Sequence, residues 1–335
     1  MKHIILCVDG TWQSGSGVTT NVSWIAQHVD VSSHRVNPTH TRQVVGYVPG
    51  VGTEGPLLSK IVGGATGWGI TPQLRDCYEA LVKHYEPGDR ISIFAFSRGA
   101  YAARRLVEWL SVSGLVDLGI YPTDMFLKDA IRRAFRNFTV RHGIRDRPPS
   151  PSFDCQFNFV GLFDTVGSLG IPVIRVLTRT LLGWWYQLFG TGLNRVLHVC
   201  QAMALDEQRR DFRVVPLSRR QRLYNAEQVW FVGSHGDVGG TYSDRRLANI
   251  PLKWMVDRAI SHGIRFDCSV PRDPKDYLAP VQESSKGLWL LRGRGPRLVE
   301  RSGQLDESVL RRLNEDHTYK PYALSSTKEH LSRWL

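Results

Sequence analysis

Short apolar runs recur along the chain, and most of them end on turns rich in glycine and polar residues. The runs have the length and the β-branched and aromatic content of buried parallel strands: Lys2 to Val8, Arg90 to Phe96, Gln156 to Phe163 and Gln228 to Gly233. Segments with helical spacing of apolar residues lie between them, for example Thr71 to Tyr85 and Gly99 to Leu110. This alternation predicts an α/β fold with a mostly parallel central sheet and helices on both faces.

The strand Arg90 to Phe96 passes into a helix through a turn that contains Ser97. The turn has the pattern small-x-Ser-x-Gly, with Ala95 at the first glycine position of the G-x-S-x-G nucleophile elbow and Gly99 at the second. Such a turn pushes the serine hydroxyl clear of the sheet, and the helix that follows directs backbone N–H groups at an anion formed there. We therefore predict Ser97 as a nucleophile and the N–H of Arg98 as a donor to the oxyanion.

A serine nucleophile requires a base and an acid, and residues suited to both roles follow later strands. Asp164 comes directly after the strand Gln156 to Phe163, and His235 comes shortly after the strand Gln228 to Gly233. The chain order Ser97, Asp164, His235 is the order of nucleophile, acid and base in α/β-hydrolases. We therefore predict an α/β-hydrolase fold in which these three residues form a catalytic triad.

The acid and the base each have competitors. Asp237 competes for the acid role because it lies only two residues after His235. We favour Asp164, and Asp237 is a supporting candidate that could instead brace the glycine turn after it. Among the eleven histidines, His198 and His262 lie in helical patterns and are interpreted as structural.

The first strand ends on the turn Asp9-Gly10-Thr11-Trp12. In a hydrolase this loop supplies the second oxyanion donor, here the N–H of Gly10 or Thr11, with Asp9 as a supporting residue. The turn also resembles that of phosphatases with an aspartyl nucleophile two residues before this aspartate, but Cys7 stands at that position, so we disfavour this alternative. Asp9 and Asp237 make an incomplete ligand set for a metal, so we expect no metal there. We also expect no cofactor.

The segment Ile171 to Leu193 is apolar and aromatic, but prolines, arginines and glycines interrupt it too often for a convincing membrane span. We predict a lid or cap at residues 171–195 whose aromatic side chains line an acyl pocket or contact lipid: Trp184, Trp185, Tyr186 and Phe189. A cap helix that packs on the sheet and never meets lipid fits the pattern equally well. With a further insertion at residues 115–155, the chain from 1 to 335 is interpreted as a single catalytic domain.

The chain carries a net charge of +12, with basic clusters at Arg132 to Arg147, Arg209 to Arg222 and Lys286 to Arg301. This charge favours an anionic surface such as a membrane as partner, and no motif for specific nucleic-acid binding accompanies it. The five cysteines lack the spacing of a zinc site or a disulfide framework, and Met1 leads into a strand rather than a signal peptide. We expect synthesis in the cytoplasm, with any export by a signal-independent route. The oligomeric state is left open.

Several motifs along the chain occur in the same order in one protein family, and together they extend over much of the sequence. They include Val8-Asp9-Gly10-Thr11-Trp12, Gly63-Gly64-Ala65-Thr66-Gly67, Phe96-Ser97-Arg98-Gly99-Ala100, Phe163-Asp164-Thr165-Val166-Gly167, Ala204-Leu205-Asp206-Glu207 and Ser234-His235-Gly236-Asp237-Val238-Gly239-Gly240. In these motifs the chain resembles the DUF2235 family, the Tle1-like α/β-hydrolases that include phospholipase effectors of bacterial type VI secretion. Ala95 and Gln13 depart from the glycine and asparagine expected there, and the match weakens after about Phe266.

The resemblance implies the same roles for Ser97, Asp164 and His235, and it implies a phospholipid substrate. We therefore expect a carboxylic ester hydrolase that works through an acyl-enzyme, as a phospholipase or lipase at lipid surfaces. One alternative is a soluble carboxylesterase that acts on small esters. Another is a catalytically silent hydrolase fold that serves as an interaction module.

Overall fold

The structure is a computed structural model that describes residues 1–10, 19–50, 70–120, 124–140, 152–167, 192–217, 225–285, 293–295, 297, 299 and 303–325. These residues form a seven-stranded sheet in the order β2-β1-β3-β6-β7-β8-β9, and its strands pair in parallel. The strands are β1 (Lys2–Val8), β2 (Arg42–Val48), β3 (Arg90–Phe96), β6 (Gln156–Phe163), β7 (Val196–Ala204), β8 (Ala226–Phe231) and β9 (Gln304–Leu305). The predicted α/β fold with a parallel central sheet is confirmed.

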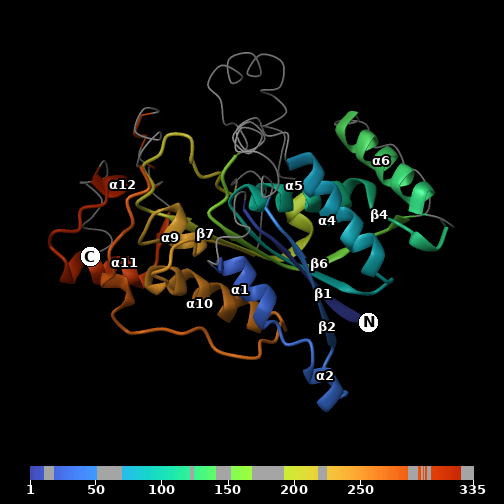
Figure 1. Ribbon diagram of the computed structural model, residues 1–335, viewed down its shortest axis with the longest axis horizontal. Helices are drawn as coiled ribbons and strands as arrows, with labels where there is room; N and C mark the ends of the chain where they lie inside the picture. The colour runs from blue at the N-terminus through green and yellow to red at the C-terminus, as the bar shows by residue number, and fades with distance from the viewer. Residues whose placement is uncertain are drawn as a thin grey trace.

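Helices cover both faces of this sheet (Figure 1). One face packs against α4 (Ile70–His84) and α5 (Ser97–Ser113), and α6 (Asp124–Val140) lies outside these two helices. The other face packs against α1 (Asn21–His28) and α10 (Arg246–Ser261). The shorter helices are α2 (Ser33–Val36), η1 (Leu118–Ile120), η2 (Gly192–Arg195), α9 (His235–Gly239), η4 (Asp276–Leu278), α11 (Glu307–Glu315) and α12 (Tyr322–Ser325). Crossover connections that carry helices are what parallel pairing of strands requires.

Two hydrophobic clusters fill the space between the sheet and its helices. In β1, Ile4 and Leu6 belong to the cluster that faces α4 and α5, whereas Ile5 and Cys7 belong to the cluster that faces α1 and α10. Successive side chains of a strand point to opposite faces, so a strand covered on both faces is apolar throughout. This burial is the reason for the continuous apolar runs from which the strands are predicted.

The predicted bounds of β1, β3 and β6 agree with the structure. The helical pattern assigned to His198 is wrong, because His198 lies in β7, which pairs with β6 on one side and with β8 on the other. The run around His198 is apolar at positions that suit either periodicity, and its two strand partners decide in favour of the strand. His262, the other histidine assigned to a helical pattern, caps the C-terminus of α10.

Part of the predicted insertion at residues 115–155 is described. Within it β4 (Leu115–Val116) pairs antiparallel with β5 (Ser152–Phe153), and α6 packs against α4 and α5. Trp109 of α5 stacks on Tyr78 of α4, with 3.9 Å between ring centroids. The insertion therefore extends the helical layer on one face of the sheet.

The predicted lid contributes only residues 192–195 to the described part of the chain. Its aromatic residues lie outside the described residues: Trp184, Trp185, Tyr186 and Phe189. The lid, like the assignment of the chain to a single domain, stays a prediction. Among the helices that the structure describes, none combines the length and the apolar character needed to cross a bilayer.

Candidate active site

Ser97 lies on the sharp turn between β3 and α5. Its φ of 58° falls in the left-handed region, where a residue with a side chain is strained. A Cβ at Gly99, in the first turn of α5, would lie 2.5 Å from the backbone oxygen of Asp9, so only glycine lets α5 begin against the end of β1. Ala95 is fully buried in the cluster that faces α4 and α5, where its methyl group is accommodated. The backbone therefore has the strand, turn and helix of the predicted elbow.

His235 contacts both Ser97 and Asp164. Its Nε2 lies 2.9 Å from Oγ of Ser97, and its Nδ1 lies 2.5 Å from Oδ2 of Asp164. The three residues follow β3, β6 and β8, whose carboxyl ends lie at one edge of the parallel sheet. They are 5% (Ser97), 0% (Asp164) and 6% (His235) exposed. The structure thus brings three residues that are distant in sequence into one buried chain of hydrogen bonds.

Asp164 is held by a buried cation as well as by His235. Arg297 donates from Nη1 to Oδ1 at 2.5 Å and from Nη2 to Oδ2 at 2.8 Å, and the N–H of Ala204 donates to Oδ1 at 2.9 Å. Burial alone would raise the pKa of Asp164, but the guanidinium of Arg297 and the hydrogen bond from His235 hold it well below its usual range. Asp164 is therefore ionised and fixed in orientation.

The imidazole of His235 lies between two aromatic rings. Phe96 stacks on it with 4.7 Å between ring centroids, and Phe212 meets it edge-on at 5.0 Å. Burial lowers the pKa of His235, and this effect outweighs the opposing influence of Asp164. The imidazole is therefore neutral at neutral pH, and a neutral imidazole can accept a proton from Ser97.

Asp237 is engaged with its own helix rather than with the imidazole. Its Oδ2 accepts hydrogen bonds from the N–H of Ser234 at 2.8 Å, from Oγ of Ser234 at 3.0 Å and from the N–H of Gln282 at 3.2 Å. With these contacts Asp237 and Ser234 form a capping box at the start of α9. Burial raises the pKa of Asp237 to about 6. Of the two candidate acids, Asp164 is the one in contact with His235.

Asp9 and Gly10 lie beside Ser97. The buried carboxylate of Asp9 accepts hydrogen bonds from the N–H of Gly10 at 2.8 Å, from Oγ1 of Thr20 at 2.6 Å and from the hydroxyl of Tyr47 at 2.8 Å. A Cβ at Gly10 would lie 3.0 Å from Cβ of Ser97, so this loop presses directly on the elbow. The N–H of Gly10 is thus directed at Asp9.

Of the two remaining predicted oxyanion donors, the structure describes Arg98 but not Thr11. Arg98 follows Ser97 in the first turn of α5, at the end of the helix where backbone N–H groups have no partner within the helix. Thr11 lies outside the described residues. The oxyanion role of Gly10, Thr11 and Arg98 stays a prediction.

Metal-ligating side chains converge elsewhere in the molecule. Among the described residues, the groups close enough to share an ion are His28 with Asp267 and Cys268, and His198 with Cys200 and Glu227. Neither group includes Asp9 or Asp237, and neither touches the hydrogen-bonded chain around His235.

Two residues that contact the hydrogen-bonded chain of Ser97, His235 and Asp164 were not among the predicted site residues. Glu207 accepts a hydrogen bond from the N–H of His235 at 3.2 Å and forms an ion pair with Arg209 at 2.8 Å. The motif Ala204 to Glu207 is a sequence signal for it, although the motif does not indicate its partner. Arg297 belongs to a basic run in which no feature distinguishes it from its neighbours, so no local signal could have identified it.

Comparison with known proteins gives one family. The chain matches the family model described as "T6SS, Phospholipase effector Tle1-like, catalytic domain" over residues 2–258. An uncharacterized protein of Saccharomyces cerevisiae is 26% identical over 244 residues, which cover 63% of this chain and 32% of that protein. The chain thus spans about a third of the length of this curated relative.

Two solved structures are also similar. One is the crystal structure of an uncharacterized protein from Pseudomonas aeruginosa, with a TM-score of 0.46 and 19% identity over 79% of this chain and 46% of that chain. The other is a Tle1 effector bound to the VgrG spike of the type VI secretion system, with a TM-score of 0.43 and 18% identity over 72% of this chain and 51% of that chain. The family model includes Ser97, Asp164 and His235 and covers most of the sequence, so the chain belongs to the family of Tle1-like phospholipase effector catalytic domains.

Proposed function

We propose that this chain is a serine hydrolase that cleaves carboxylic esters, with phospholipids as its substrate class. The observation that carries the proposal is the hydrogen-bonded chain from Oγ of Ser97 through His235 to Asp164, with distances of 2.9 Å and 2.5 Å. A serine on a strained strand-to-helix turn, an imidazole of lowered pKa and an ionised carboxylate are the groups that acyl transfer requires.

In the proposed reaction, Oγ of Ser97 attacks the ester carbonyl carbon while Nε2 of His235 takes the hydroxyl proton. The imidazolium that forms is stabilised by Asp164, with which its Nδ1–H already shares a hydrogen bond. The carbonyl oxygen becomes an oxyanion at the N-terminus of α5, where the N–H of Arg98 and the loop after β1 are the proposed donors. Collapse of this intermediate releases the alcohol, which takes the proton from His235, and leaves an acyl group on Ser97.

Water then removes the acyl group from Ser97. His235 accepts a proton from the water as its oxygen attacks the acyl carbon, and it returns that proton to Oγ of Ser97 as the free acid leaves. Asp164 remains ionised throughout, because Arg297 and the N–H of Ala204 continue to hold its carboxylate.

Membership of a phospholipase effector family supports a lipid as the substrate. The net charge of +12 adds attraction to anionic headgroups, and the apolar segment Ile171 to Leu193 supplies a candidate surface for acyl chains. Export by a type VI secretion system is part of the same proposal. A soluble carboxylesterase and a silent interaction module are the competing outcomes of the experiment below.

The test compares the wild type with Ser97→Ala on a short p-nitrophenyl ester and on anionic phospholipid vesicles, with released acid as the readout. Ser111→Ala is the matched control, because Ser111 lies on the same helix and its hydroxyl bonds the backbone oxygen of Val107. We expect Ser97→Ala to lose at least about a thousandfold in kcat/KM on both substrates, with the control unchanged. Hydrolysis of the small ester alone would favour the soluble esterase, and no hydrolysis of either substrate by the wild type would favour the silent interaction module. Hydrolysis that survives Ser97→Ala would refute the serine mechanism.

A further inference from the structure

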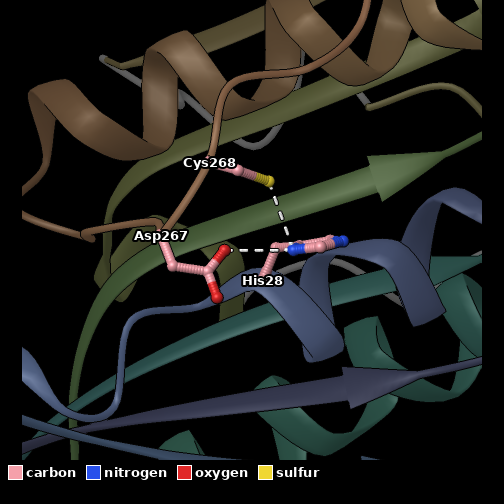
Figure 2. Close-up of side chains that lie close together, drawn as sticks. All are labelled: His28, Asp267 and Cys268. Carbon is pink, nitrogen blue, oxygen red and sulfur yellow. Dashed lines mark hydrogen bonds and ion pairs between the residues drawn. The ribbon is translucent and has the colours of Figure 1, made fainter.

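Three side chains with metal-ligating atoms converge at the end of the sheet away from Ser97. His28 is the last residue of α1, and Asp267 and Cys268 follow α10 in sequence. Nδ1 of His28 lies 3.0 Å from Oδ1 of Asp267 and 3.2 Å from Sγ of Cys268, and Figure 2 shows both side chains pointing at this one nitrogen. The three residues form what we call the His28 cluster.

The arrangement differs from that of a proton relay. Around His235, the acid lies at Nδ1 and the serine at Nε2, so each ring nitrogen serves one partner. In the His28 cluster, the carboxylate and the thiol both face Nδ1. A ring nitrogen carries either one proton or one lone pair, so it can serve only one of these partners fully. A cation among the three atoms would instead bind a lone pair from each.

The spacing of the three atoms suits a small transition-metal ion. Zinc binds imidazole nitrogen and carboxylate oxygen at about 2.0–2.2 Å and thiolate sulfur at about 2.3 Å. In tetrahedral geometry these bonds separate neighbouring ligand atoms by roughly 3.3–3.6 Å. The two distances from Nδ1 of His28, 3.0 Å to Asp267 and 3.2 Å to Cys268, are a few tenths of an ångström below this spacing, and all three ligand atoms lie within 4.8 Å of one another.

The backbone beneath the cluster is already joined. Val29 and Phe266 form an antiparallel bridge, the N–H of Asp267 donates to the backbone oxygen of His28 at 3.0 Å, and the N–H of Asp30 donates to that of Arg265 at 2.9 Å. Trp24 packs on the ring of His28 with 4.4 Å between centroids. The ligands therefore start from a fixed platform, and little ordering would accompany binding.

The charge at the cluster also favours a divalent cation. A carboxylate and a thiolate together balance two positive charges, and the ion pair that the structure gives Asp267 is with His28 itself. The group of His198, Cys200 and Glu227 offers a contrast, because the guanidinium of Arg258 already pairs with Glu227 at 3.1 Å. Cys200 is also fully buried, which raises the pKa of its thiol well above the usual value. The charge of Glu227 is therefore already balanced within the protein. In the His28 cluster, by contrast, Asp267 and Cys268 are exposed to solvent.

We propose that His28, Asp267 and Cys268 bind a zinc ion, with solvent as its fourth ligand. The ion would tie the C-terminus of α1 to the segment after α10, and it would act on stability rather than on ester cleavage. The proposal stands independently of the serine mechanism, because it uses none of the residues around Ser97.

Cobalt(II) is the first probe, because thiolate-bound cobalt absorbs in the near ultraviolet. Of the five cysteines only Cys268 is exposed, so this band in the folded protein reports on the His28 cluster. We expect about one cobalt per chain, displacement of the band by Zn²⁺ and its loss in Cys268→Ser. His28→Gln should weaken Zn²⁺ binding at least about tenfold, and His34→Gln, on the neighbouring α2, serves as the control that binds normally.

The unfolding temperature gives a second readout. An ion that binds only the folded chain raises it, so Zn²⁺ should stabilise the wild type and His34→Gln but neither Cys268→Ser nor His28→Gln. Absence of the cobalt band in the wild type, or a band that persists in Cys268→Ser, would overturn the proposal. Equal stabilisation of all four proteins by Zn²⁺ would overturn it as well.

Discussion

Arg297 and Asp164 form a two-pronged buried ion pair, with Nη1 at 2.5 Å from Oδ1 and Nη2 at 2.8 Å from Oδ2. Arg297 is 5% exposed and also donates to the backbone oxygens of Ala204 and Phe212. It lies beyond residue 258, where the family match ends, yet it holds the carboxylate that faces His235. We infer that Arg297 positions the proposed acid without touching the substrate.

Replacement of Arg297 should alter the pH profile as well as the rate. In Arg297→Gln the charge of Asp164 is less compensated, so the pKa of His235 rises and the base stays protonated to a higher pH. We expect kcat/KM to fall at least about tenfold at neutral pH and its acidic limb to move to higher pH, with partial rescue in Arg297→Lys. A rate loss with an unshifted profile in a folded variant would assign Arg297 a purely structural role. Circular dichroism checks the fold, since breaking a buried pair costs about 3–5 kcal/mol.

The two candidate acids should respond differently to removal of their charge. Asp164→Asn takes away the partner that stabilises the imidazolium, so we expect a loss in kcat of about ten-thousandfold. Asp237→Asn leaves the contact between Asp164 and His235 intact, so its rate should stay within about fivefold of the wild type. Steady-state kinetics on the p-nitrophenyl ester measures both. Similar losses in the two variants would mean that Asp237 shares the acid role.

Asp237 should make stability depend on pH in a definite direction. Its pKa is raised to about 6 in the folded chain, against an ordinary value of 3.8, so the folded state binds more protons between these values. Stability from this group therefore falls as the pH rises through that window and is lowest above about 6. We expect urea unfolding of Asp237→Asn to show a weaker decline between about pH 4 and pH 6 than the wild type shows. Parallel curves for the two proteins would contradict the raised pKa.

Gly99 should tolerate no side chain. A Cβ there would meet the backbone oxygens of Asp9 and Val8, which cannot move without disturbing β1. Gly99→Ala should therefore lose at least about 2 kcal/mol in free energy of unfolding. Gly167→Ala is the matched control, because a Cβ at Gly167 would make only an ordinary contact with Val215 at 3.7 Å. Chemical denaturation of both variants measures the difference, and equal stabilities would show that α5 can shift away from β1.

Much of the fold and the candidate site could be predicted from local sequence. β3 and β6 are central strands covered on both faces, so they are apolar throughout, and their ends are marked by Ser97 and Asp164. Small residues around Ser97 signal the sharp turn, because that turn permits little beyond a hydrogen or a methyl group. The apolar run before His235 and the glycines after it indicate this residue in the same way.

Contacts between distant segments were decided only by the tertiary structure. Cys268 reaches His28, and Arg297 reaches Asp164, across more than a hundred residues of chain. The sequence marks Arg297 only as one basic residue among several. Along the sequence, Asp237 is also nearer to His235 than Asp164 is. The choice among these partners depends on which side chains the packed sheet brings within about 3 Å of each other, and local patterns carry no record of that distance. The sequence by itself thus determined β1, β3 and β6 and the residue types at their ends, because burial and turn geometry are local constraints. The folded chain determined which of those residues meet.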